Sequence, residues 1–333
     1  MIDISVILCT YNRCQSLAKS LESLAASEVP SSLTWEVLVI DNNSNDDTPK
    51  VVEQIRTRYP GRFQYYFEPS QGKSFALNTG IRSASGRVVA FIDDDVVADP
   101  SWLHNLTANI LTARCSGTGG KILLDPSFSP PDWLPVEGPF SLAGMLAVFD
   151  LGDQPRPLDR PPFGTNMAFL RTMFDQYGFF RTDMGPSPGS EIRNEDVEFC
   201  RRLMSGGEIL LYEPSAVVYH AVPERRRSQR YFLRFWFDHG RASVRERGVR
   251  PPIAGIPRCY FSILKVFAFS GPTALFRWLI ARDSKTRFYR KGWLWMLAGE
   301  ITEWWRSRLR HIQNAEHPTR IPGTTRQGMT PGP

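Results

Sequence analysis

The first hundred residues alternate between short, continuous apolar runs and longer segments whose apolar residues recur at helical spacing. The continuous runs have the length and composition of buried strands, and they cover residues 4–9, 35–41, 63–67 and 88–92. The segments between them predict amphipathic helices, and they cover residues 14–26, 46–59 and 74–85. Because strands alternate with helices, we expect an α/β fold whose mostly parallel sheet carries helices on both faces.

Short polar residues stand where the predicted helices begin. Asn12 precedes the first helix, and Asp47 or Thr48 begins the second. Asn194 begins a further predicted helix at residues 194–207. Side chains of this kind accept hydrogen bonds from the free N–H groups of a first turn. We therefore expect these residues to be N-caps.

The segment between the two groups of elements is rich in proline. Residues 125–162 carry so many prolines that we expect loops or a lid there, because proline cannot donate to a sheet ladder. After the helix at 194–207, residues 208–220 predict two short strands that end at His220.

The net charge of +6 hides an uneven distribution along the chain. Residues 1–223 hold 18 Lys and Arg against 27 Asp and Glu, whereas residues 224–312 hold 20 against 6. A basic segment favours an anionic partner, either nucleic acid or an anionic membrane surface. Residues 313–333 form a polar tail that we expect to be disordered.

Two apolar stretches in the basic region, residues 260–281 and 291–305, are interrupted by charges. The longest uncharged run of the first, Val266–Phe276, has 11 residues and contains Gly271 and Pro272. A membrane-spanning helix needs about 20 apolar residues, so we expect amphipathic helices that lie in the plane of a membrane. This context makes a membrane the favoured partner over nucleic acid.

The cysteines and the N-terminus bear on the compartment. Five cysteines are an odd number and include no CxxC pair, which argues against a zinc site or a disulfide framework. The N-terminus has no basic region before its first apolar run. We expect a cytoplasmic protein, peripheral on the cytoplasmic face of a membrane.

Three consecutive carboxylates, Asp93, Asp94 and Asp95, follow the predicted strand at 88–92. Carboxylate oxygens are hard ligands that suit Mg2+ or Mn2+, and these ions complete their coordination shells with substrate phosphates. Thr10 and Asp41 end the neighbouring strands, and ligands of such sheets bind at the carboxyl ends of the strands. A metal and diphosphate site is therefore favoured, with a solvated loop cap as the alternative.

Five segments, in order, resemble the family-2 glycosyltransferases, which have the GT-A fold. They are SVILCTYNR, EVLVIDNNSNDDT, QGKSFALNTGIRSASGRVVAFIDDDV, GTNMAFLR and NEDVEFCRRLMSGG. The resemblance implies a catalytic domain at residues 1–223, with the nucleotide sugar on 1–100 and the acceptor on 101–223. Residues 224–312 would then be a separate basic helical region.

The resemblance also implies roles for individual residues. The nucleotide-sugar site would contain Thr10, Asn12, Arg13, Asp41, Lys73, Asp93 and Asp94. The metal, Mg2+ or Mn2+, would be held by Asp95 and His220. Asp196 would be the catalytic base, with Glu195 beside it as the second candidate.

The activity that follows is an inverting, metal-dependent hexosyl transfer. A sugar would move from a nucleoside diphosphate, with UDP favoured, to a hydroxyl of a lipid-linked or cell-envelope glycan. Arg230 and Trp236 lie out of register with the QxxRW motif of polymer-extruding members, so transfer of one sugar or a few is favoured. Two alternatives remain: a sugar nucleotidyltransferase, and a non-catalytic protein that binds nucleic acid or an anionic surface through residues 225–250.

Overall fold

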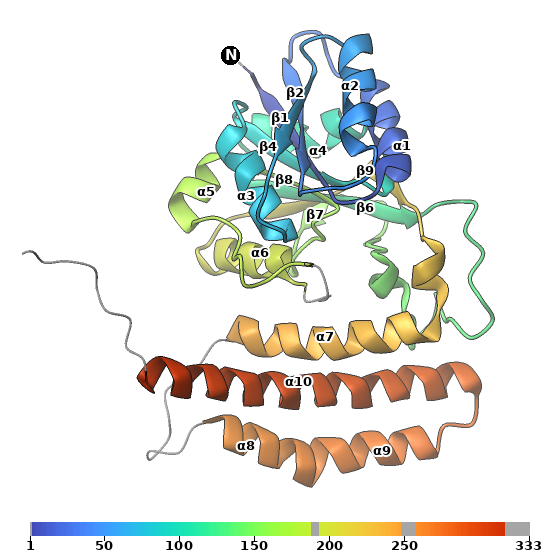
Figure 1. The fold of residues 1–333 in the computed structure, drawn as a ribbon. Helices are drawn as coiled ribbons and strands as arrows, with labels where there is room; N and C mark the ends of the chain where they lie inside the picture. Colours follow the sequence, from blue (N-terminus) through green and yellow to red (C-terminus); the bar gives the residue numbers. More distant parts are fainter. Residues whose placement is uncertain (1, 188–192, 248–257, 317–333) are drawn as a thin grey trace, which may run out of the picture.

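A nine-stranded mixed sheet forms the centre of the N-terminal two-thirds of the chain (Figure 1). The computed structural model describes residues 2–187, 193–247 and 258–316. The strand order is β3-β2-β1-β4-β8-β6-β9-β5, and β7 pairs with β9. The strands are β1 (Ile4–Thr10), β2 (Trp35–Asp41), β3 (Phe63–Phe67), β4 (Val88–Asp93), β5 (Val96–Ala98), β6 (Gly117–Leu124), β7 (Arg156–Pro157), β8 (Asn166–Leu170) and β9 (Leu210–His220).

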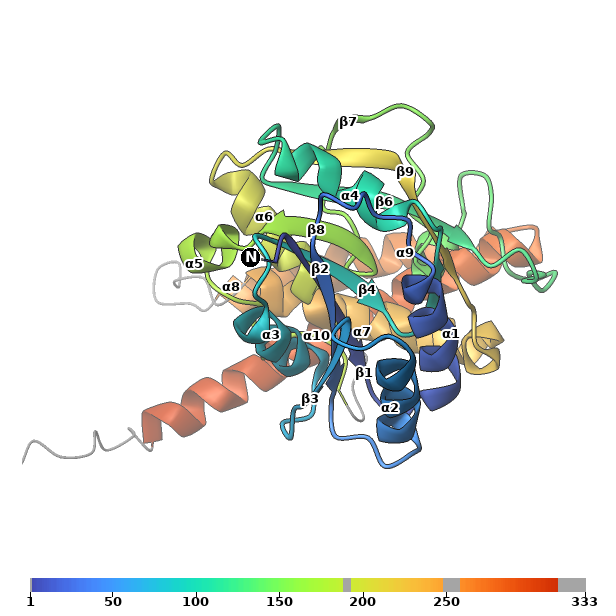
Figure 2. The ribbon, with the colours of Figure 1, turned by 90° about the horizontal axis from the view of Figure 1, so that it is seen from above.

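Helices cover both faces of this sheet. Figure 2 shows α3 on one side of the parallel strands and α1 with α2 on the other. The helices of this part are α1 (Cys14–Ala25), α2 (Thr48–Arg58), α3 (Lys73–Ser83), α4 (Trp102–Leu111), α5 (Thr172–Tyr177) and α6 (Glu195–Ser205). The predicted α/β fold is confirmed, and the elements predicted before residue 94 agree with the structure to within two residues.

The register of the parallel strands brings their polar ends to one edge. Strands β1 to β4 pair in parallel in the order β3-β2-β1-β4. Thr10 pairs with Asp41, and Cys9 pairs with Asp93, so the three strands end at the same level. Thr10, Asp41 and Asp93 therefore lie at one edge of the sheet, as predicted.

The remaining strands were not predicted in this form. Strand β6 contains three glycines and was not predicted. A Cβ on Gly120 would collide with the side chain of Asn166 and the carbonyl of Ala216. The glycine therefore allows close packing within a strand. Residues 210–220 form one strand rather than two, although its register with β6 shifts between Glu213 and Val217, around Pro214.

The predicted N-caps are wrong in their side-chain contacts. Asn12 adopts a left-handed φ of 51° and its Oδ1 accepts the N–H of Asn45, 2.7 Å away. The carboxylate of Asp46 instead accepts the N–H groups of Cys14 and Thr48, at the starts of both α1 and α2. Neither Asp47 nor Asn194, which precede α2 and α6, makes a side-chain capping bond.

The proline-rich segment is mostly irregular, as predicted, and it is anchored by an apolar cluster. Leu134, Leu142 and Leu146 are buried in it, and Leu146 belongs to a short 3-10 helix, Ala143–Leu146. They pack with Val222, Phe232 and Phe288, which precede or belong to the C-terminal helices. The segment therefore connects the sheet domain to the helices that follow.

The C-terminal helices form stacked layers below the sheet domain (Figure 1). Helix α7 (Gln229–Arg247) lies nearest to it, α10 (Ser284–Glu316) lies next, and α8 (Arg258–Lys265) with α9 (Gly271–Leu279) lies outermost. A π-helical turn, Val266–Ser270, joins α8 to α9, and Glu224–Arg227 form a 3-10 turn before α7. Helix α10 extends four residues beyond the predicted boundary at 312, and 317–333 lie outside the described residues.

Several arginines of α7 form ion pairs with glutamates of α10. Arg241 and Arg245 both pair with Glu303 of α10, which is 0% exposed, and Arg247 pairs with Glu300. These contacts hold α7 against α10. Three of the basic residues in the predicted anion-binding stretch 225–250 are therefore paired within the protein.

The outermost layer exposes large apolar side chains. They are Phe261, Leu264, Phe267, Phe269, Leu275, Phe276, Leu279 and Ile280, each at least 45% exposed. Within the described part of the chain, no helix has the length and apolarity that crossing a membrane requires.

Candidate active site

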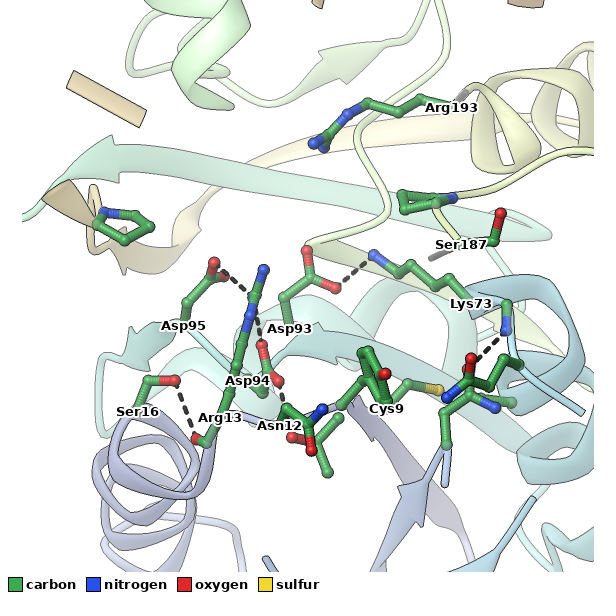
Figure 3. A pocket seen from close by; sticks show the side chains of 18 of the residues that line it. Cys9, Asn12, Arg13, Ser16, Lys73, Asp93, Asp94, Asp95, Ser187 and Arg193 are labelled. Atoms are coloured by element: carbon green, nitrogen blue, oxygen red, sulfur yellow. Dashed lines mark hydrogen bonds and ion pairs between the residues drawn. The ribbon is translucent and has the colours of Figure 1, made fainter. Parts of the chain in front are cut away.

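A cavity of about 690 Å3 lies at the carboxyl ends of β1 and β4. Most of the residues that the sequence assigned to the nucleotide sugar line it (Figure 3). The predicted residues in its wall are Thr10, Asn12, Arg13, Lys73, Asp93, Asp94 and Asp95. The structure therefore brings these seven residues together at one cavity.

Asp94 is bound by two residues from the end of β1 and the loop after it. Its Oδ2 accepts the hydroxyl of Thr10 at 2.7 Å, and its Oδ1 accepts Nη1 of Arg13 at 2.7 Å. Burial nevertheless raises the pKa of Asp94, and repulsion from Asp95 and Asp93 adds to that effect while Arg13 and Thr10 oppose it.

Asp93 joins elements that are far apart in the sequence. Its Oδ1 lies 2.5 Å from Nζ of Lys73, at the start of α3, and its Oδ2 accepts the hydroxyl of Thr165 at 2.7 Å. Although burial raises the pKa of Asp93, attraction to Lys73 and the hydrogen bonds from Lys73 and Thr165 outweigh it, so the pKa is lowered. Asp93 is therefore a carboxylate held in its charged form.

Asp95 lies among three cationic or basic groups. Its Oδ1 lies 3.4 Å from Nε2 of His220, and its Oδ2 lies 2.9 Å from Nη1 of Arg13 and 3.5 Å from Nη2 of Arg226. Burial would raise the pKa of Asp95, but His220 and Arg226 hold it well below its usual range. Arg13, Arg226 and Lys73 thus supply positive charge beside the three carboxylates.

Asp95 and His220 fit the role of metal ligands. The donor atoms of the carboxylate and the imidazole lie 3.4 Å apart. The carboxylate suits Mg2+ or Mn2+, whereas an imidazole nitrogen is a softer ligand that favours Mn2+ over Mg2+. His220 is buried, and its Nδ1 has no hydrogen-bond partner in the described part of the chain. No group of three or more His, Cys, Asp or Glu side chains gathers around a metal position among the described residues. Substrate phosphates would have to complete the coordination shell of the metal. Arg13 and Arg226 would compete with the ion for the carboxylate of Asp95.

Asp41 ends β2 but does not line the cavity. It is 1% exposed, and its carboxylate accepts the hydroxyl of Tyr65 at 2.8 Å and the N–H of Ser44 at 2.9 Å. The next residue, Asn42, lines the cavity instead. Its Oδ1 accepts the N–H of Gly72, which adopts a φ of 138° and so needs to be glycine.

The two predicted base candidates occupy the first turn of α6. Oδ2 of Asp196 accepts the N–H of Gly164 at 2.6 Å, which fixes a half-buried carboxylate next to Thr165. Glu195 is 4% exposed, and burial together with repulsion from Asp196 raises its pKa to about 7, while Lys73 opposes this. Asp196 is thus the more accessible of the two candidates, and neither of them lines the cavity.

Two arginines of the cavity wall were missed from the sequence. Arg226 comes from the 3-10 turn before α7, and Arg193 comes from the loop before α6. Arg193 lies across the cavity from the carboxylates (Figure 3), with its guanidinium 5.1 Å from the ring of Phe235. Arg226 belongs to a basic stretch without a motif, so no local signal distinguished it from surface arginines. Arg193 directly precedes the segment NEDVEFCRRLMSGG, and that position was the one signal that could have pointed to it.

A family model described as "Glycosyl transferase family 2" matches residues 5–178, which is more than half of the chain. The chain belongs to glycosyltransferase family 2. It is 29% identical over 245 residues to the succinoglycan biosynthesis protein ExoM of Rhizobium meliloti, a match that covers 73% of this chain and 74% of that protein. It is 35% identical over 218 residues to the glycosyltransferase AglE of Haloferax volcanii, covering 65% and 66% of the two chains.

Solved structures agree with the fold of this family-2 glycosyltransferase. The mannosyltransferase PcManGT of Pyrobaculum calidifontis, solved with GDP-Man and Mn2+, superposes with a TM-score of 0.60 at 19% identity. That match covers 91% of this chain and 87% of the other. TarS of S. aureus, solved with UDP-GlcNAc, gives a TM-score of 0.52 at 16% identity, with 94% and 92% covered.

Proposed function

We propose that this glycosyltransferase moves a sugar from a nucleoside diphosphate sugar to a hydroxyl of a lipid-linked or cell-envelope glycan, with inversion at the anomeric carbon. The observation that carries the proposal is the cavity itself. It holds three carboxylates and several cationic side chains at the strand ends. The carboxylate of Asp196, at the start of α6, is linked to it through the loop before β8, where Gly164 donates to Asp196 and Thr165 donates to Asp93. This arrangement suits a donor with a diphosphate and an acceptor that must lose a proton.

The chemistry is a single displacement. The acceptor oxygen attacks the anomeric carbon as the bond from that carbon to the diphosphate oxygen breaks, and Asp196 takes the proton of the acceptor hydroxyl. A positioned general base typically contributes about 10²–10⁴-fold to the rate. Lys73, Arg13 and Arg193, which line the cavity, would stabilise the charge that develops on the departing diphosphate.

Asp95 and His220 would hold a divalent cation. When bound, Mg2+ or Mn2+ would neutralise diphosphate charge and so improve the leaving group. The structural neighbour solved with GDP-Man and Mn2+ supports this assignment, and the neighbour solved with UDP-GlcNAc supports a UDP-linked donor as the first to test.

The acceptor class is supported by the names of two relatives. One is a glucosyl-dolichyl phosphate glucuronosyltransferase of Haloferax volcanii, 26% identical over 246 residues. Another is a GalNAc(5)-diNAcBac-PP-undecaprenol β-1,3-glucosyltransferase of Campylobacter jejuni, 35% identical over 97 residues. Both names describe a sugar acceptor carried on a lipid.

A peripheral position on a membrane agrees with the outermost layer of the fold. An exposed apolar face as extended as that of α8 and α9 is typical of an interaction surface. Cys9, Cys14, Cys115 and Cys200 are free thiols, which favours the cytoplasmic face, where thiols stay reduced.

The test is calorimetric titration with a panel of nucleotide sugars, with and without Mn2+, followed by transfer assays with the donors that bind. We expect one donor to bind well only with the metal, and Asp95→Asn to lose that metal-dependent part. Failure of every nucleotide sugar to bind would reject the proposal. Metal-dependent binding that Asp95→Asn leaves unchanged would reject the metal assignment alone.

A further inference from the structure

A second cavity, of about 480 Å3, lies in the C-terminal layers and shares no residue with the catalytic one. Its wall combines α9, the π-helical turn before it, α10 and one residue of the proline-rich segment. The residues that matter here are Phe140, Phe269, Arg277, Arg290, Trp293 and Leu297. Figure 1 shows α9 as part of the layer farthest from the sheet, and the cavity lies where this layer meets α10 and the proline-rich segment.

Two cationic side chains line this cavity. Nη1 of Arg290 donates to the carbonyl oxygen of Arg277 at 2.6 Å, and the Arg290 guanidinium lies 5.8 Å from the ring centre of Phe140. Among the described residues, neither Arg277 nor Arg290 forms an ion pair with a carboxylate. In α7, by contrast, Arg241 and Arg245 are neutralised by Glu303. The two arginines of the cavity therefore offer donors to an anion from outside the protein.

The rim of the cavity is apolar and exposed. Phe269 is 70% exposed and Trp293 is 42% exposed, and both line the cavity. Phe267, Phe276 and Leu279, on the same turn and helix, are at least 60% exposed. A free inorganic anion would use the arginines but would leave this apolar surface in water. A molecule with an anionic head and an apolar chain would satisfy both.

We propose that this cavity binds the phosphate headgroup of a membrane lipid, with the lipid's chain lying along the exposed face of α9 and the π-helical turn. Guanidinium groups bind phosphate oxygens through charge-assisted hydrogen bonds, and Arg is well suited to this because its donors form a fork. Trp293 lines the cavity beside Trp236 of α7, with ring centres 5.6 Å apart, and its exposed part adds apolar surface for the start of the lipid chain. The site rests on the membrane association proposed above, but the catalytic scheme does not use it.

The first experiment is a fluorescence titration of the full chain with dihexanoyl phosphatidic acid, kept below its micelle concentration. Trp293 lines the cavity, so we expect a saturable change that Trp293→Phe removes. Inorganic phosphate at the same concentrations should leave the signal unchanged. A response to inorganic phosphate of equal affinity, or no saturable response to the lipid, would overturn the proposal.

The second experiment compares two variants that each remove one positive charge. Arg277→Gln should weaken lipid binding about fivefold or more, since one basic residue at an anionic headgroup contributes roughly that factor. Arg282→Gln is the matched control, because Arg282 is exposed and lies near the end of the same helix but outside the cavity. Equal weakening by both variants would mean diffuse attraction without a site.

Two further measurements keep the outcomes distinct. Nucleotide-sugar binding at the catalytic cavity is measured on the same samples, so that loss of lipid binding alone rejects this site and not the proposed function. Sedimentation velocity without lipid tests whether a second copy of the chain covers the apolar face. A dimer that Phe276→Ser dissociates would also overturn the proposal.

Discussion

The guanidinium of Arg226 lies 3.1 Å from Nε2 of His220, and both side chains are buried. The same guanidinium lies 3.5 Å from Asp95, so it takes up the space beside the two expected metal ligands. A divalent cation must displace it to reach both donor atoms. We predict that Arg226→Gln binds Mn2+ alone about tenfold more tightly than the unaltered protein, because a charged hydrogen bond contributes about 1.5–3 kcal/mol. Calorimetry with Mn2+ and no nucleotide measures this.

Arg227→Gln is the matched control for this prediction. The Arg227 guanidinium donates to the carbonyl oxygen of Val222 and lies over the ring of Phe128, outside the group around Asp95. It should therefore leave Mn2+ affinity unchanged. If Arg226→Gln and Arg227→Gln bind Mn2+ equally, Arg226 does not compete with the ion.

The sequence predicted the nucleotide side of the fold because its signals are local. Each of β1 to β4 is a short, mainly apolar run that can be read from the sequence alone. Because these strands pair in parallel, the residues that end them lie at one edge of the sheet. Strand β6 was missed because its glycines reflect contacts with Asn166 and Ala216, which are distant in sequence. Asn12 was predicted to be an N-cap because asparagine favours that position. In the structure, the carboxylate of Asp46 accepts the N–H of Cys14 at the start of α1 instead.

For a related reason, the carboxylates of the site were predicted from the sequence, whereas Arg226 and Thr165, which contact them, were not. Asp93, Asp94 and Asp95 are adjacent in sequence, so their combined charge was visible in the letters alone. Arg226 and Thr165 reach the same carboxylates from segments more than 70 residues away. Only the tertiary fold brings them there. Thr165 lies within the segment GTNMAFLR, but that resemblance gave it no partner, and no motif surrounds Arg226.

Asp196→Asn tests the base. We expect donor binding to be unchanged and transfer to fall by about 10²–10⁴-fold, because an amide cannot accept the acceptor's proton. The amide oxygen can still accept the N–H of Gly164, so the loop should keep its position. Steady-state kinetics and donor calorimetry on the same preparation separate the two effects. Glu198→Gln, in the same helix turn and paired with Arg202, is a control that should transfer normally.

Glu195 makes a prediction about stability and pH. Its pKa is raised from 4.5 to about 7 in the folded protein, mainly by burial, so the folded state holds this proton more tightly than the unfolded chain. The unfolded state then binds fewer protons between about pH 4.5 and 7, and the free energy of unfolding falls as pH rises through that window. The total is roughly 3 kcal/mol.

Glu195→Gln removes this ionisation while keeping a neutral group of the same shape. Compared with the unaltered protein, the variant should gain relative stability between pH 5 and 8. Urea unfolding at those two pH values measures the difference. If Asp196 is the base, the variant also transfers sugar normally; loss of transfer with intact donor binding would move the base to Glu195.

The outermost helices give the last prediction, which concerns membrane binding. Leu264, Phe267 and Phe276 are 61–65% exposed on α8, the π-helical turn and α9, and none lines the lipid-phosphate cavity. Burying an apolar side chain of this size contributes about 1.5–3 kcal/mol, so replacing each by Ser should weaken vesicle binding by about tenfold or more. Because these side chains face solvent, the thermal unfolding of the variants should be unchanged.

Phe67→Ser and Ile209→Ser are controls, since both residues are more than 50% exposed but belong to the sheet domain. Vesicle co-sedimentation in moderate salt, where attraction between charges is screened, isolates the apolar contribution. Equal binding by all five variants would mean that α8 and α9 do not enter the membrane.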